Sequence, residues 1–427
     1  MTYQETLEFL YQQLPMYQRV GPMAMKKDLT NIRILCAALG NPQERLRSIH
    51  IAGTNGKGST AHMLAAVLQS AGYRTGLYTS PHYRDFRERV KLDGALVPED
   101  YVVDFVEQHQ ALIADVKPSF FEISVAMAFA YFAQQEVDWA VIEVGLGGRL
   151  DSTNIILPEL CVITNISYDH QQFLGDTLAS IAKEKAGIIK PGVPVVISES
   201  QQETKPVFLA KAKREYAPII FADQSFVVTE RSRNLEHTTY AVQKGGETRY
   251  EDLKVNVHGN YQSKNVQAVL QALEWMPEDV KIEDKAIRKG LEKVREKTRF
   301  LGRWQLLSRQ PMTICDSAHN EAGLEAVAKE LDALFYERLH IVLGMVNDKS
   351  PAQLLKFLPE DARYYFAKPA IPRGLEAEDL QQAAAQQERK GDVYESIPKA
   401  LEAARTEAGP KDVIYVGGSI FVVAEVV

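Results

Sequence analysis

The stretch Ile49-His-Ile-Ala-Gly-Thr-Asn-Gly-Lys-Gly-Ser-Thr-Ala-His-Met63 decides the fold of this chain. A short apolar run ends in a glycine loop with one lysine and two hydroxyl groups, and an alanine- and leucine-rich helical pattern follows. Glycines let backbone N–H groups crowd around anionic oxygens, and the start of a helix adds positive potential. With Lys57 as a mobile charge, the segment predicts a binding loop for the phosphates of a nucleoside triphosphate.

The loop departs from the standard P-loop pattern. Ile51 stands where the first glycine is expected, and Gly58 separates Lys57 from Ser59. The alternative is a plain glycine turn with a solvated lysine. Three glycines in a strand–loop–helix context favour the phosphate-binding interpretation.

Composition places the chain among ordinary globular proteins. Its 427 residues exceed what one hydrophobic core usually serves, so two domains are expected. The net charge is −7 and no basic run occurs, so nucleic acid is not an expected partner. We find no signal-like segment and no apolar stretch long enough to span a membrane. Cys36, Cys161 and Cys315 have no paired spacing, which indicates buried thiols and a cytoplasmic location.

The chain alternates strand-like and helical patterns, which predicts an α/β fold with a mostly parallel sheet. Strands are expected at 48–52, 139–144, 160–166, 193–198 and 218–222, and helices at 60–71, 98–114, 123–134 and 177–188. The polar segment 224–257 breaks the alternation and reads as an antiparallel hairpin excursion.

A charged run at 288–299 predicts a solvated helix near a domain junction. After it the alternation resumes, with strands expected at 312–315, 339–343, 364–366 and 413–416 and helices at 321–334, 352–357 and 397–408. We therefore expect a P-loop-type domain over residues 1–298 and a smaller Rossmann-like domain over 299–427.

Three residues at the ends of apolar runs are candidate magnesium ligands: Ser80, Glu143 and His170. Ligands of parallel α/β sheets bind beyond the carboxyl ends of strands, where the phosphate loop also lies. Taken singly, each has a plainer explanation: a turn cap for Ser80, a solvated or paired Glu143, and a loop histidine for His170.

Other polar segments remain open between a structural and a functional role. The loop 145–154 contains Asp151 and Asn154, which could make turns or face a substrate. By composition, the helix 182–190 is an amphipathic surface helix with solvated lysines. Asp316, His319 and Asn320 open a helix at a strand end, where Asn320 could be a cap.

Together these segments resemble the folylpolyglutamate synthase/dihydrofolate synthase family within the Mur-ligase-like ATP-dependent amide ligases. The resemblance runs through nearly the whole chain. Its most specific parts are the Lys-Gly-Ser form of the phosphate loop and the glycine-spaced run beginning at Glu143. The matching segments are 39–42, 53–59, 79–82, 120–122, 143–154, 169–170, 184–188, 259–265, 302–303, 316–320, 348–349 and 417–419.

The resemblance implies roles position by position. Lys57 would contact the terminal phosphates of ATP, in a cradle that includes Thr54, Asn55, Gly56, Gly58 and Ser59. Ser80 and Glu143 resemble ligands of one Mg²⁺ and His170 a ligand of a second. Lys185 matches a lysine that the family carries as an N-carbamate, which reverses the composition-based interpretation of its helix. Asn265, Arg303 and Asp316 resemble nucleotide contacts, Phe121 and Asp151 positions of pterin binding, and His319 a contact of the incoming amino acid.

The activity implied is ATP-dependent amide formation between a pteroate or folate carboxylate and L-glutamate through an acyl phosphate, in the bifunctional bacterial form and as a monomer. Two alternatives are a Mur-type ligase of cell-wall precursors and a nucleotide sensor without turnover. No segment before residue 45 resembles a UDP-sugar-binding domain, which argues against the first. The chain departs from the family pattern at Leu301, Tyr261 and Ser119, where proline, histidine and threonine are usual.

Overall fold

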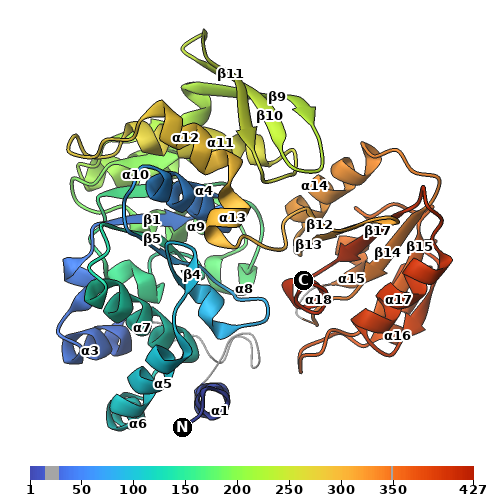
Figure 1. Cartoon of the computed structure of the whole chain (residues 1–427), viewed down its shortest axis with the longest axis horizontal. Coiled ribbons are helices and arrows are strands. Elements are labelled where there is room, and N and C mark those ends of the chain that lie inside the picture. The colour runs from blue at the N-terminus through green and yellow to red at the C-terminus, as the bar shows by residue number, and fades with distance from the viewer. Residues whose placement is uncertain (15–27, 348–349) are drawn as a thin grey trace. The chain divides into compact units, whose positions relative to one another are not determined.

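The computed structural model describes residues 1–14, 28–347 and 350–427 and divides into two compact units. The first comprises Met1–Asn256 with Gln262–Phe300, and the second Val257–Tyr261 with Leu301–Val427. The family-like segment 348–349 lies outside the described residues. Both units are α/β, with mostly parallel sheets, as predicted (Figure 1).

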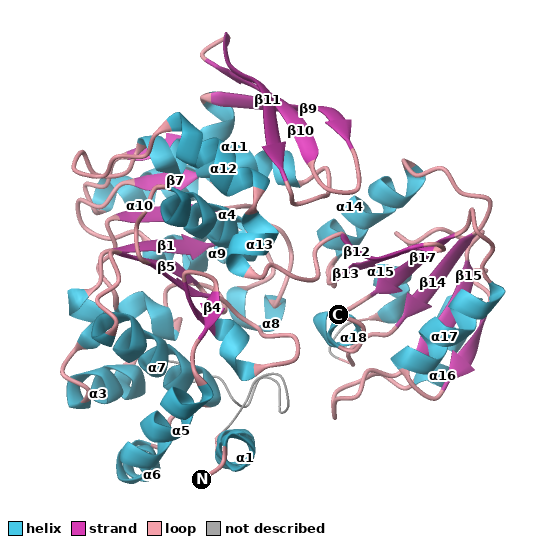
Figure 2. Ribbon diagram, in the orientation of Figure 1, coloured by secondary structure: helices cyan, strands magenta, loops and turns pink. Residues whose placement is uncertain are grey.

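The first unit is built on an eight-stranded sheet in the order β4-β3-β2-β5-β1-β6-β7-β8 (Figure 2). Strands β2 and β5 to β8 run parallel with β1, while β3 pairs antiparallel with both of its neighbours, β2 and β4. The strands are β1 (Ser48–Ala52), β2 (Thr75–Tyr78), β3 (Val90–Leu92), β4 (Ala95–Leu96), β5 (Trp139–Glu143), β6 (Leu160–Ile163), β7 (Val195–Ile197) and β8 (Ile219–Phe221). β2, β3 and β4 were not among the predicted strands, because segments of two to four residues are too short to show a clear period.

Helices cover both faces of this sheet. In Figure 1, α4, α11 and α12 lie together on one face, and α3, α5, α6 and α7 gather on the other. The helices are α1 (Tyr3–Gln13), α3 (Thr30–Ala38), α4 (Lys57–Ser70), α5 (Glu99–Gln108), α6 (Gln110–Val116), α7 (Phe120–Gln134), α8 (Gln171–Leu174), α9 (Leu178–Lys185), α10 (Lys205–Arg214), α11 (Gln262–Glu274), α12 (Asp284–Glu292) and α13 (Val294–Thr298). Short 3₁₀ turns are η2 (Pro42–Arg45), η3 (Phe86–Arg89), η4 (Ser152–Ile155), η5 (Ala186–Ile188) and η6 (Ala222–Gln224).

Three sequence-based predictions need correction here. The charged run 288–299, expected as one solvated helix, is divided between α12 and α13, and Leu291 and Val294 within it are buried. The helix expected at 98–114 is two helices, which meet at His109. The His109 ring lies 2.6 Å from the Phe105 carbonyl oxygen, and the main-chain N–H of His109 donates to the Val106 carbonyl instead of continuing the helix. The excursion expected as a hairpin is a three-stranded antiparallel sheet of β9 (Phe226–Arg233), β10 (Thr238–Lys244) and β11 (Glu247–Val255).

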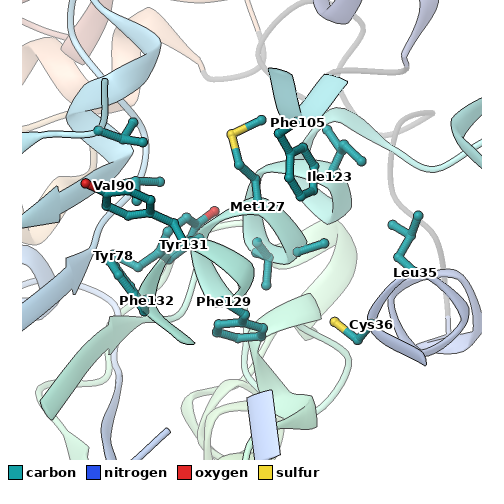
Figure 3. Close-up of a cluster of buried hydrophobic side chains, with 14 of the residues drawn as sticks. Leu35, Cys36, Tyr78, Val90, Phe105, Ile123, Met127, Phe129, Tyr131 and Phe132 are labelled. Atoms are coloured by element: carbon teal, nitrogen blue, oxygen red, sulfur yellow. The ribbon is translucent and has the colours of Figure 1, made fainter. Parts of the chain in front are cut away.

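The core beneath the sheet is organised by α7, which is apolar on nearly its whole circumference and is buried accordingly. A capping box starts this helix: Ser119 Oγ accepts from the Glu122 N–H, and the Glu122 carboxylate accepts from the Ser119 N–H. Figure 3 shows Met127, Phe129 and Phe132 packed with side chains of α3, α5, β2 and β3.

The second unit holds a six-stranded sheet in the order β12-β13-β17-β14-β15-β16, with β12 antiparallel and the rest parallel. Its elements are β12 (Gln305–Arg309), β13 (Met312–Asp316), α14 (Glu321–Asp332), β14 (Leu339–Leu343), α15 (Pro351–Leu355), β15 (Arg363–Ala367), α16 (Ala377–Ala385), β16 (Gly391–Tyr394), α17 (Ile397–Glu407), β17 (Val413–Gly417) and α18 (Ile420–Ala424). All three cysteines of the chain are buried thiols. In the described part of the chain, no helix combines the length and the apolar character that a bilayer crossing needs.

Candidate active site

The glycine loop joins β1 directly to α4, as the sequence predicts. Gly56 is the N-cap of α4 and has φ +89°, a conformation that other residues rarely adopt. A Cβ atom at this position would lie 2.3 Å from Oδ1 of Asn265. The structure therefore brings Asn265, from α11, against the phosphate-binding loop, where the sequence analysis expected a nucleotide contact.

Residues that follow β6 hold this loop in shape. Asn165 accepts from both Thr54 N–H, through its main-chain carbonyl, and Asn55 N–H, through Oδ1, each over 2.8 Å. Thr164 Oγ1 donates to the carbonyl of Asn55 over 2.6 Å. Sequence reasoning missed Thr164 and Asn165, although their position directly after a buried strand at the same sheet edge is a signal.

Two lysines converge on the loop from inside. Lys57 Nζ donates to the carbonyl oxygens of Gly53 and Thr54 over 3.1 and 3.0 Å, and Lys185 Nζ donates to that of Gly53 over 2.8 Å. Lys185 ends α9 and is only 3% exposed. Burial, followed by the charge of Lys57, lowers the pKa of Lys185 to about 7. The composition-based interpretation of Lys185 as a solvated residue is wrong, because the helix turns this side chain inward.

Glu143 and Ser80 lie together beside the start of α4. The Ser80 N–H donates to Glu143 Oε2 over 3.1 Å, and a Cβ at Gly58 would lie 3.5 Å from Oε1. Glu143 ends β5 and is 5% exposed. A buried carboxylate at this loop offers hard oxygen atoms of the kind that Mg²⁺ prefers.

The described residues contain no group of three or more histidine, cysteine, aspartate or glutamate side chains that could hold a metal ion. His170 stands on a separate loop after β6, with φ +49° at the N-cap of α8, and its Nε2 lies 3.8 Å from Asp169 Oδ2.

A hydrogen-bonded chain links the loop to α11. Gln262 Nε2 donates to Ser59 Oγ over 3.3 Å, and Asn265 Nδ2 donates to Gln262 Oε1 over 2.9 Å. Ser59 and Asn265 were both candidate nucleotide contacts, and Gln262, which joins them, was missed. Its spacing of three residues from Asn265 on one helix face is the signal that could have found it.

Phe121 and Asp151, the two candidate pterin positions, meet at Gly145. A Cβ on Gly145 would lie 2.4 Å from Phe121 Cζ and 3.2 Å from Asp151 Oδ2. The Phe121 ring is also 6.2 Å from that of Tyr78. The end of β2 and the loop after β5 thus both lie against Phe121, at the start of α7.

In the second unit, Asp316 organises the candidate residues near its N-terminal segment. Its carboxylate accepts from Tyr261 O–H over 3.0 Å, Trp304 N–H over 2.7 Å and Ala318 N–H over 2.8 Å. Arg303 lies in the turn that these bonds fix, and His319 Nδ1 is 3.0 Å from the Ser317 carbonyl oxygen.

Asn320 in the second unit is a helix cap: its Oδ1 accepts from the Gly323 N–H over 2.9 Å at the start of α14. The capping role that the sequence analysis gave as an alternative for Asn320 is confirmed.

Comparison with known proteins identifies the two domains. Residues 51–273 match the Mur ligase middle domain, and residues 302–420 match the Mur ligase glutamate ligase domain. The chain is thus an ATP-dependent ligase of the Mur type. It is 33% identical to the dihydrofolate synthase/folylpolyglutamate synthase of Bacillus subtilis, over 94% of each chain.

Two solved structures agree with this assignment. E. coli FolC in complex with DHPP and ADP has a TM-score of 0.87 and 29% identity, covering 100% of this chain and 97% of its own. A bifunctional folylpolyglutamate synthase/dihydrofolate synthase with Mn, AMPPNP and L-glutamate bound has a TM-score of 0.85 and 28% identity, covering 100% and 97%. The chain belongs to the folylpolyglutamate synthase/dihydrofolate synthase family.

Proposed function

We propose that this chain forms an amide between the carboxylate of a pteroate or folate and the amine of L-glutamate, with cleavage of ATP. The observation that carries the proposal is the convergence of Lys57 and Lys185 on the Gly53 carbonyl, next to a loop with the Ser80–Glu143 contact. Phosphoryl transfer requires cationic groups that neutralise phosphate charge and oxygen groups that hold a divalent cation, and both kinds of group lie at one edge of the sheet. We propose both synthase activities for the chain, since Phe121 and Asp151 lie together.

The reaction proceeds in two steps. A carboxylate oxygen of the acceptor attacks the γ-phosphorus of ATP, the bond to the bridging oxygen breaks, and an acyl phosphate and ADP form. The amine of glutamate then attacks the acyl carbon, phosphate leaves with the bonding electron pair, and the nitrogen loses a proton. Lys57 offsets the repulsion between carboxylate and triphosphate, the main electrostatic barrier to the first step.

We propose that the site binds two divalent cations. Ser80 and Glu143 would hold one and His170 a second, and Mg²⁺ bound there would neutralise phosphate charge. Thr54, Asn55, Gly56, Gly58 and Ser59 would cradle the phosphates of ATP. Asn265, Arg303 and Asp316 would contact the nucleotide, and His319 the incoming glutamate.

Lys185 is proposed to work as a carbamate. Its neutral amine would add carbon dioxide at nitrogen and release one proton, which replaces a buried cation by an anion near the phosphate loop. The lowered pKa supports this, because a larger share of the amine is neutral at physiological pH. The anion would also remove the repulsion between Lys185 and Lys57.

We assign residues 1–298 to ATP binding and 299–427 to glutamate ligation, and we expect a cytoplasmic monomer with small-molecule substrates only.

The deciding experiment is ADP release with ATP, Mg²⁺ and L-glutamate, comparing 7,8-dihydropteroate with tetrahydrofolate as acceptor. Release with both acceptors supports the bifunctional proposal, and release with one of them narrows it to that activity. Stimulation by UDP-linked muramyl substrates alone would indicate a cell-wall ligase instead. Tight binding of ATP without acceptor-dependent release would indicate a nucleotide sensor.

A further inference from the structure

The imidazole of His50 lies in the middle of β1, and the function proposed above gives it no role. The residue is completely buried, in a central parallel strand where apolar side chains are usual. Its Nε2 lies 2.8 Å from Oγ1 of Thr153, which is also completely buried and belongs to η4. A polar group at such a position requires a hydrogen-bond partner, because burying it without one costs free energy.

Thr153 connects His50 to Asp151. The Thr153 hydroxyl donates to Asp151 Oδ1 over 2.5 Å, and the Thr153 N–H donates to the same oxygen over 3.0 Å. A hydroxyl carries a single proton, so the contact with His50 must run the other way: Nε2–H donates to Thr153 Oγ1. The geometry thereby fixes the tautomer of His50.

The surroundings of the second ring nitrogen, Nδ1, are those of a neutral imidazole. Nδ1 of His50 is buried and meets no hydrogen-bond partner in the described part of the chain. A proton there would be an unpaired buried donor on a charged ring. Burial, with a smaller contribution from Lys190, lowers the pKa of His50 to about 3. The ring therefore stays a neutral donor throughout the physiological range.

The remaining oxygen of Asp151 holds the glycine loop. Oδ2 accepts from the Leu146 N–H over 2.8 Å, and the Gly145 N–H is a further hydrogen-bond donor to this carboxylate. The same Gly145 lies against the Phe121 ring. Asp151 thus fixes the peptide that packs on Phe121, and the hydrogen-bond chain from His50 orients Asp151.

We propose that His50 and Thr153 are positioning residues for the pteroate or folate acceptor: they orient Asp151, which holds the Gly145–Leu146 peptide against Phe121. This inference rests on the proposed function for the identity of the acceptor. The hydrogen-bond chain should affect the KM for the acceptor more than the KM for ATP, because its bonds run from His50 through Thr153 and Asp151 to the Leu146 N–H.

Kinetics test the proposal with paired variants. We expect His50→Leu and Thr153→Val each to raise the acceptor KM at least about tenfold, the order expected for one lost buried hydrogen bond. His50→Gln and Thr153→Ser keep the donor and should recover most of the effect. His62→Leu is the matched control, because His62 is buried on α4 with Nδ1 2.7 Å from Thr298 Oγ1. An unchanged acceptor KM, or equal changes in both KM values, overturns the proposal.

A spectroscopic measurement on the wild-type chain is independent of substrate and needs only the conservative variant His50→Gln for assignment. Long-range ¹H–¹⁵N correlation should show His50 as the neutral Nε2–H tautomer, with its signal assigned by loss in His50→Gln. An Nδ1–H tautomer or an imidazolium would overturn the hydrogen-bond chain itself. If no pteroate or folate supports ADP release, the proposed function fails, while this spectrum still decides the role of His50 towards Thr153.

Discussion

Lys57 and Lys185 donate hydrogen bonds from their Nζ atoms to the same oxygen, the carbonyl of Gly53, over 3.1 and 2.8 Å. Two ammonium groups on one acceptor repel each other, and the charge of Lys57 contributes to the lowered pKa of Lys185. An anion bound at this place relieves that repulsion. We therefore expect the pair, while both amines are protonated, to favour an anion beside this loop.

Removing the charge of Lys57 should disable phosphoryl transfer. We expect Lys57→Ala to lower turnover by at least about a hundredfold, the scale seen when a group that stabilises developing charge is removed. The measurement is the rate of acceptor-dependent ADP release at saturating ATP. Lys183→Ala, an exposed lysine on α9, is the control and should retain normal turnover. A near-normal rate for Lys57→Ala would remove this residue from the mechanism.

Neutralising Glu143 should weaken the binding of the divalent cation. Glu143→Gln keeps the size of the side chain and loses its charge, so the Mg²⁺ concentration at half-maximal rate should rise by at least about tenfold, the range seen when a metal-site group is altered. Glu136→Gln provides the matched control, as Glu136 is exposed just before the same strand. Equal Mg²⁺ dependence in the two variants would contradict the assignment.

The buried Lys185 should make folding stability depend on pH. Its pKa is about 7 in the native state, against 10.5 for a free lysine side chain, so between these values the unfolded chain binds the extra proton. Stability contributed by this group therefore rises with pH across that window and falls as pH approaches 7. Urea unfolding near pH 7 and near pH 9 in carbon-dioxide-free buffer should show a smaller pH slope in Lys185→Met than in the wild type. Lys183→Met should keep the wild-type slope, and identical slopes in all three proteins would refute the burial of a neutral amine.

The cap of α7 should contribute measurably to stability. Ser119→Ala removes the acceptor of the Glu122 N–H and should lower the free energy of unfolding by about 1 kcal/mol. Ser119→Thr retains the hydroxyl and should be close to neutral. Chemical denaturation of the three proteins measures the difference, and a Ser119→Ala variant as stable as the wild type would show that Glu122 N–H finds another acceptor.

Much of the fold followed from local patterns. The boundaries of β1 at Ser48–Ala52 and β14 at Leu339–Leu343 agree with the predicted ranges, because buried parallel strands are continuous apolar runs. The break between α5 and α6 could not be predicted, since it depends on where the ring of His109 turns. The short strands β3 and β4 form because they pair with neighbouring strands, and they are too short to show a hydrophobic period in the sequence.

The candidate site, like the fold, could be predicted only in part from the sequence. Glycine spacing, a lysine and a helical pattern marked the phosphate loop, and the resemblance marked Lys185 against the composition of its helix. Sequence reasoning missed Thr164, Asn165 and Gln262, which shape or join the loop from more than a hundred residues away. It also passed over His50, which lies inside the quoted segment but acquires its role only through Thr153.

By itself, the sequence determined where strands, helices and the glycine loop occur, because hydrophobic period and glycine conformation act within a few residues. Only the tertiary structure decided which side chains meet. Asn55 and Asn165 are 110 positions apart, and Lys185 and Gly53 are 132 apart, yet each pair is joined by a hydrogen bond. The parallel sheet brings the carboxyl ends of its strands to one edge, and burial at that edge then sets which groups are charged.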